Sequence, residues 1–168
     1  MRGGTGISVH WKIFAATVLT VAALDQATKL IITQSLPVYS GVEVVPGFFS
    51  IVHYLNKGAA FGILNDGGAA KKLFLIGVSL VSLAIVTFLI RQSTSRLHSF
   101  AFSLIAGGAV GNLIDRVRFG SVVDFLDFYL YTRHWPAFNV ADSAITAGVA
   151  IALFSYLFGN EKSGEENI

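Results

Sequence analysis

Residues 73–90 read LFLIGVSLVSLAIVTFLI, without a single charged side chain. A helix that crosses the hydrocarbon core of a bilayer needs about 20 consecutive, mostly apolar residues. This run therefore predicts a transmembrane helix. It makes an integral membrane protein the first hypothesis for the whole chain.

Three further stretches have the composition of membrane spans. They are residues 12–34 (containing IFAATVLTVAAL), 99–117 (SFAFSLIAGGAVGNLIDRV) and 138–158 (FNVADSAITAGVAIALFSYLF). The first could instead be a cleaved signal peptide, but Asp25 and Lys29 stand where a small-residue cleavage site would be needed. We therefore predict an all-α integral membrane protein with four transmembrane helices. A single domain covers residues 1–160, and residues 161–168 form a polar, disordered tail.

The composition of the chain supports the same hypothesis, since 54% of its residues are hydrophobic and 13% are charged. Soluble domains carry about 25% charged residues. Cysteine is absent, which excludes disulfides, zinc–thiolate sites and thiol nucleophiles. The net charge of +2, without a long Lys/Arg run, does not indicate nucleic-acid binding.

Two sizeable segments, about residues 37–72 and 118–136, connect the spans on the side opposite the termini. The first is rich in Val, Phe and Ile with Gly and Pro between them, which predicts a small β-rich segment at the membrane surface. The second is rich in aromatic residues, and we predict a short interfacial helix over Asp127–His134. Basic residues occur on both sides, so counting them does not decide the orientation.

Charged residues at membrane depth are candidates for function, because burying them in lipid is costly. Asp25 and Lys29 are four residues apart, with the acid first, which favours a structural ion pair on one helix. Asn112, Asp115 and Arg116 share a helical face near the end of the third span. For Asp115 and Arg116 we favour a polar cluster that ties this helix end to its neighbours.

Two further acids flank the segment before the fourth span. Asp124 lies between Val123 and Phe125, and such apolar surroundings raise the pKa of a carboxyl group. Asp142 lies in the first turn of the fourth span, on the same face as Asn139. A favourable helix dipole could explain Asp142 alone. It does not explain Asp124, or why four acids gather at one membrane face. Asp127 is interpreted as a helix cap or a solvated charge.

Five motifs in order resemble the bacterial lipoprotein signal peptidases, also called signal peptidase II, over nearly the whole chain. They are DQATK (Asp25–Lys29), NKGAAFG (Asn56–Gly62), GGAVGNLIDR (Gly107–Arg116), VVDF (Val122–Phe125) and FNVADSAI (Phe138–Ile145). The resemblance implies an intramembrane aspartic endopeptidase. Such an enzyme removes the signal peptide from diacylglyceryl-modified prolipoproteins, cutting before the lipidated cysteine.

By the same resemblance, Asp124 and Asp142 are the catalytic pair, and Asp25 and Lys29 are the motif of the first helix. The polar residues expected to bind substrate or support the site are Asn56, Asn112, Asp115, Arg116 and Asn139. No metal or cofactor is implied. The family places its active site near the outer face of the bacterial cytoplasmic membrane, which puts both termini in the cytoplasm. We expect a monomer that contacts membrane lipid and is inhibited by globomycin-type cyclic peptides.

Two other classes of protein share part of this pattern. A proton-coupled transporter would also carry intramembrane carboxylates, but near the midplane and within repeated, broken helices. A structural subunit would explain the four spans but not the clustered acids. Without the resemblance, the residues alone leave all three classes open.

Overall fold

The computed structural model describes residues 5–58 and 68–158, and four long helices dominate it. They are α1 (Thr5–Ser35), α2 (Gly68–Gln92), α3 (Arg96–Phe119) and α4 (Val140–Phe158). Each is long and apolar enough to cross a membrane, which confirms the four predicted spans. α1 and α2 begin before the predicted bounds, and in α2 the added residues include Ala and Lys, which favour a helix. The predicted tail 161–168 lies outside the described residues.

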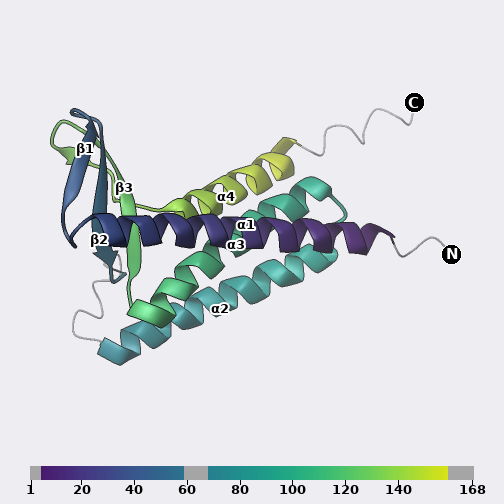
Figure 1. The fold of residues 1–168 in the computed structure, drawn as a ribbon. Helices are drawn as coiled ribbons and strands as arrows, with labels where there is room; N and C mark the ends of the chain where they lie inside the picture. Colours follow the sequence, from purple (N-terminus) through teal and green to yellow (C-terminus); the bar gives the residue numbers. More distant parts are fainter. Residues whose placement is uncertain (1–4, 59–67, 159–168) are drawn as a thin grey trace.

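A four-stranded antiparallel sheet lies at one end of the helices (Figure 1). Its strands are β1 (Gly41–Val45), β2 (Phe49–Asn56), β3 (Val122–Leu130) and β4 (Arg133–His134), in that order. The β-rich segment predicted from the first connection is therefore confirmed as β1 and β2. Unexpectedly, the second connection completes the sheet, since Asp124 pairs with Tyr54 of β2.

The interfacial helix predicted over Asp127–His134 is wrong. The segment belongs to β3 and β4, because the neighbouring strand β2 supplies partners for its backbone: Ser50 is in register with Asp127. Asp127 is neither a helix cap nor a solvated charge. It is buried, and its carboxylate oxygens lie 3.0 Å from Nδ1 of His134.

α3 packs against the other three helices, and its glycines allow close approach. A Cβ atom at Gly107 would lie 2.8 Å from Cβ of Val21 in α1. A Cβ atom at Gly108 would collide with the backbone oxygen of Ala141 in α4. The small-residue pattern thus places α1 and α4 directly against α3, as expected for helices in lipid.

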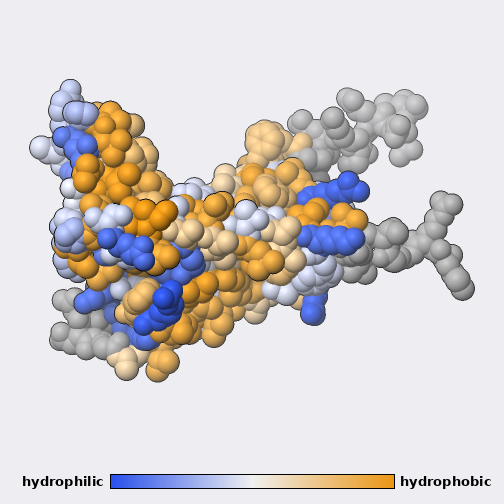
Figure 2. Space-filling model, in the orientation of Figure 1, coloured by the Kyte–Doolittle hydropathy of each residue, from blue (hydrophilic) through white to orange (hydrophobic). Residues whose placement is uncertain are grey.

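The two ends of the helix bundle carry different elements of the fold. α1 begins and α4 ends at the same end, away from the sheet, and the connection from α2 to α3 also lies there (Figure 1). Apolar side chains cover the middle of the helices, and hydrophilic ones gather toward both ends (Figure 2). The polar residues singled out in the sequence gather at the end that carries the sheet.

Candidate active site

A buried cluster of charges joins α1 to α3 beside the sheet. Nζ of Lys29 lies 2.8 Å from Oδ2 of Asp25 and 2.9 Å from Oδ2 of Asp115. All three side chains are almost completely shielded from solvent. The predicted pair of Asp25 and Lys29 therefore forms, and Asp115 joins it as a second acid. Such charge-assisted bonds are strong where water is excluded.

Each acid of this cluster also accepts a hydrogen bond from the backbone of another element. Oδ1 of Asp25 accepts one from the N–H of Ala141 at 2.9 Å, in the first turn of α4. Oδ2 of Asp115 accepts one from the N–H of Val123 at 3.1 Å, in β3. The cluster thus holds the start of α4 and the start of β3 against α1 and α3.

Asp124 and Asp142 follow directly after those two backbone groups, and side-chain amides link them. Nδ2 of Asn139 donates to Oδ1 of Asp124 at 2.8 Å and to Oδ1 of Asn112 at 3.2 Å. Nδ2 of Asn112 in turn donates to Oδ1 of Asp142 at 2.8 Å. From the sheet, Nδ2 of Asn56 donates to Oδ2 of Asp124 at 2.9 Å. The structure therefore brings the two predicted catalytic acids into one hydrogen-bonded network.

Backbone and ammonium donors fix how the amides are oriented. Oδ1 of Asn139 accepts from the N–H of Asp142 at 2.9 Å, as an N-cap residue does. Oδ1 of Asn56 accepts from the N–H of Gly58 at 2.8 Å, and Oδ1 of Asn112 accepts from Lys29 at 3.1 Å. Because each amide oxygen is engaged, each amide nitrogen must point toward a carboxylate.

The electrostatic environment of Asp124 differs from that of an ordinary surface acid. Burial raises its pKa to about 6, and the negative charge of Asp142 adds to the increase. The amide donors of Asn56 and Asn139 oppose this effect by stabilising the ionised form. Asp124 can therefore gain or lose a proton near neutral pH.

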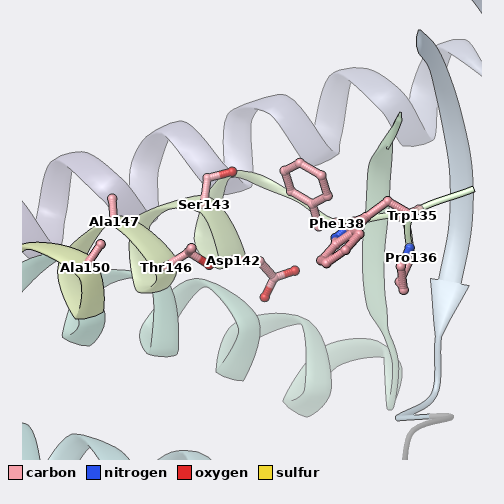
Figure 3. A pocket seen from close by; sticks show the side chains of 9 residues that line it. Trp135, Pro136, Phe138, Asp142, Ser143, Thr146, Ala147 and Ala150 are labelled. Atoms are coloured by element: carbon pink, nitrogen blue, oxygen red, sulfur yellow. The ribbon is translucent and has the colours of Figure 1, made fainter. Parts of the chain in front are cut away.

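A cavity of about 540 Å³ borders Asp142. Figure 3 shows Asp142, Thr146 and Ala150 following one another along α4, with Phe138 and Trp135 toward the sheet. The cavity occupies the hollow between the sheet and α4 that is visible in Figure 2. It combines small and apolar side chains with one carboxylate, which suits an extended, largely apolar ligand.

Arg116 stands apart from the other predicted residues. Its Nη1 donates to Oγ of Ser79 in α2 at 3.2 Å, while its buried Nε has no hydrogen-bond partner among the described residues. The guanidinium is near enough to Asp142 and Asp124 to interact with both electrostatically. It is thus placed beside the pair without contacting it.

Two residues that hold these side chains, Gln26 and Ser79, were not predicted from the sequence. Gln26 donates from Nε2 to Oδ1 of Asp115 at 2.9 Å and to the backbone oxygen of Gly111 at 3.2 Å. Its place within the DQATK motif could have indicated a role. Ser79, the partner of Arg116, lies in the most apolar span and carries no comparable signal.

Two carboxylates linked by side-chain amides lie at one end of four membrane-spanning helices, and one of them, Asp142, borders an apolar cavity; this arrangement suits an intramembrane hydrolase of the aspartic type. The family model described as "Signal peptidase (SPase) II" matches residues 17–158. The chain therefore belongs to the signal peptidase II family. This membership does not favour the transporter or the structural subunit.

Curated relatives and solved structures agree with this assignment. A lipoprotein signal peptidase of Geobacter metallireducens is 44% identical over 94% of this chain and 98% of its own. One from Geobacter sulfurreducens is 49% identical over 84% of this chain and 89% of its own. Two structures described as bacterial membrane enzymes superpose with TM-scores of 0.76 and 0.78. They are 34% and 31% identical, covering 86% and 92% of this chain and 92% and 93% of theirs.

Proposed function

We propose that this enzyme removes the signal peptide from diacylglyceryl-modified prolipoproteins, and that Asp124 and Asp142 are its catalytic pair. The observation that supports the pair is its hydrogen-bonded network: Asn139 and Asn112 join the two carboxylates, and Asp142 borders the cavity. Family membership supports the reaction, and the relatives are themselves named lipoprotein signal peptidases.

Peptide hydrolysis by two carboxylates needs one ionised group and one protonated group. The ionised carboxylate takes a proton from water, whose oxygen attacks the scissile carbonyl carbon, and the protonated one donates a hydrogen bond to the carbonyl oxygen. Collapse of the tetrahedral intermediate breaks the C–N bond, and the leaving nitrogen takes up a proton from the pair. A pKa of about 6 at Asp124 favours a shared proton near neutral pH.

The surroundings of the pair support a substrate that lies in the membrane. The cavity runs from Asp142 along α4 past Thr146 to Ala150, toward the middle of the bilayer. An apolar signal peptide could occupy this path while its scissile bond reaches the carboxylates. The acyl chains of the lipidated cysteine would then remain in surrounding lipid. Asn56, Asn112, Asp115, Arg116 and Asn139 support the site in this proposal.

The proposed orientation in the bacterial cytoplasmic membrane rests on the family resemblance, because basic residues lie at both ends of the bundle. Lys12, Arg91 and Arg96 lie at the end remote from the sheet, and Lys71, Lys72 and Arg118 lie at the end that carries it. Both termini would then be cytoplasmic, and the catalytic pair would lie near the outer face. A cysteine introduced at Ser163 should resist membrane-impermeant thiol reagents in intact cells, and efficient external labelling would contradict this orientation.

Residues 1–160 act, in this proposal, as one monomeric peptidase domain that works without metal or cofactor. The decisive experiment compares cleavage of one prolipoprotein with and without its diacylglyceryl group. The lipidated form should be cut before the cysteine, and the unlipidated form at least about tenfold more slowly, because lipid holds the substrate at membrane level. Globomycin should block the reaction. Equal turnover of both forms would contradict the proposed substrate class.

A further inference from the structure

We propose that Asp25 and Asp115 are positioning residues for the catalytic pair, and that Lys29 joins them into one frame that fixes the separation of Asp124 and Asp142. This inference rests on the proposed function, because it presupposes that those two carboxylates react. It goes beyond a structural ion pair, since the frame holds the backbone N–H groups of the residues directly before the two reacting acids.

The first arm of the frame ends at β3. Oδ2 of Asp115 accepts the N–H of Val123, the residue directly before Asp124. Oδ1 of Asp115 is held by Gln26, so the carboxylate cannot rotate away without losing a bond. Pairing with β2 fixes β3 along its length, and Asp115 fixes the start of β3 relative to α3.

The second arm ends at α4. Oδ1 of Asp25 accepts the N–H of Ala141, the residue directly before Asp142. An N-terminal helix turn leaves several N–H groups without partners inside the helix. Asn139, which directly precedes α4, accepts the N–H of Asp142. Asp25 accepts the N–H of Ala141 from a different helix, α1. The position of α4 is thereby tied to α1.

Lys29 connects the two arms. Its ammonium group has three donors, and it contacts Oδ2 of Asp25, Oδ2 of Asp115 and Oδ1 of Asn112. Asn112 then donates to Asp142, so the frame reaches that residue through a side chain as well as through the backbone. Movement at either arm would change the distance between the catalytic carboxylates.

The same contacts explain why Asp25 and Asp115 position rather than react. Each of their oxygens already accepts a hydrogen bond from an ammonium, amide or backbone donor. Catalysis nevertheless depends on them, because a displacement of about 1 Å at a reacting group costs roughly 100-fold in rate.

The test compares Asp25→Asn with Asp25→Ala, and Asp115→Asn with Asp115→Ala, in the purified full-length enzyme with a lipidated prolipoprotein. An asparagine keeps an oxygen for the backbone N–H, and an alanine does not. The alanine variants should lose about 100-fold in kcat with little change in KM, and the asparagine variants should recover at least about tenfold of that loss. If an alanine variant does not accumulate, Asp→Glu replaces it, since it keeps the charge but displaces the acceptor.

Glu43→Ala is the matched control. Glu43 also accepts a backbone N–H, from Gly47 at 2.9 Å, but on the exposed strand β1. Its loss should leave kcat unchanged. An unchanged kcat in all folded Asp25 and Asp115 variants would overturn the positioning role, and so would equal losses in the asparagine and alanine variants. Substantial cleavage by Asp124→Asn or Asp142→Asn would instead remove the catalytic pair itself.

Discussion

Two groups of acids lie side by side at the sheet end of the bundle, and their surroundings differ. Asp25 and Asp115 share the ammonium group of Lys29. Asp124 and Asp142 meet amide groups instead, and no Lys or Arg nitrogen contacts either one among the described residues. The first group thus has a cation as its partner, whereas the surroundings of Asp124 raise its pKa to about 6 and leave it able to exchange a proton.

The two groups of acids therefore have different roles: Asp25 and Asp115 stabilise the fold around the site, and Asp124 and Asp142 carry out the proposed reaction. A buried carboxylate with its own cation contributes to the fold only while the cation is present. A buried carboxylate without one has its pKa raised, as burial does for Asp124. Lys29 therefore contacts the acids that hold the chain, while Asp124 and Asp142 are hydrogen-bonded to amides and only near the charges of Arg116 and Lys29. Variants of each group test this difference in role.

The largest expected effect is on activity. Asp124→Asn and Asp142→Asn keep the shape of the side chain but remove its ability to exchange a proton. Each should lower kcat by at least about 10⁴-fold, and the double variant should be little worse, because members of one catalytic unit are not additive. Folded yield and thermal stability should remain close to those of the wild type. Cleavage assays and thermal unfolding in the same detergent measure both quantities.

Substantial cleavage by a variant of either residue would show that this residue does not belong to the catalytic pair. Asp115 would then be the next candidate for the second carboxylate, because it lies near the end of α3 and contacts β3. Its contacts with Lys29, Gln26 and Val123 argue against that role.

The second effect is on folding. Lys29→Ala leaves Asp25 and Asp115 buried without their cation, which costs about 3–5 kcal/mol when one partner of a buried pair is removed. Folded yield should fall at least as much as the specific activity of the protein that remains. Gel filtration and activity per folded molecule give the two numbers. A stable, fully folded and inactive variant would instead show that Lys29 acts on catalysis rather than on folding.

The third effect is smaller and concerns the helix contact behind the charged cluster. A Cβ atom at Gly111 would lie 2.5 Å from Oδ2 of Asp25 and 3.3 Å from Cβ of Ala141. Asp25 cannot yield easily, because Lys29 and the backbone of Ala141 hold it. Gly111→Ala should therefore destabilise the protein by about 1–3 kcal/mol, the usual cost of overpacking.

Gly77→Ala provides the control for that substitution. Gly77 lies in α2 with no atom within 4 Å of an added Cβ. An alanine there should be neutral or slightly stabilising, since alanine favours the helix more than glycine does. Equal destabilisation by both substitutions would show that close contact at Gly111 is not the cause.

The four spans could be predicted because apolar length is a local property of the chain. Leu73–Ile90 needs no partner to be recognised as membrane-spanning. The ion pair of Asp25 with Lys29 is local too, since both lie on one helical face. The grouping of these residues with Asp124 and Asp142 came from the resemblance, because helix spacing alone cannot bring four separate segments together.

The conformation of residues 127–134 could not be predicted in the same way. Strand β3 exists because β2 pairs with it across a long stretch of sequence, and a single segment does not reveal its partner. β3 is also buried on both faces near Asp124, so it lacks the alternation of polar and apolar residues that marks a half-buried strand. Its aromatic residues fitted an interfacial helix equally well.

The smallest effect concerns the proton of Asp124. We expect a bell-shaped dependence of kcat/KM on pH, with one inflection near the Asp124 pKa of about 6, although the apparent values belong to the coupled pair. Asn56 stabilises the ionised form of Asp124 through its hydrogen bond. Asn56→Ala removes that donor, so Asp124 should hold its proton to higher pH. The inflection should move upward by about 0.5–1 pH unit, which corresponds to the net free energy of one hydrogen bond.

Ser50→Ala, on the same strand but bonded to Tyr129, should leave the profile in place. The position of the inflection is the readout, because a loss of substrate binding would lower the whole curve without moving it. A downward shift in Asn56→Ala would mean that the amide stabilises the protonated acid, and a profile flat from pH 5 to 8 would mean that Asp124 does not titrate. The first result would overturn the effect assigned to Asn56, and the second would end the distinction between the two groups of acids.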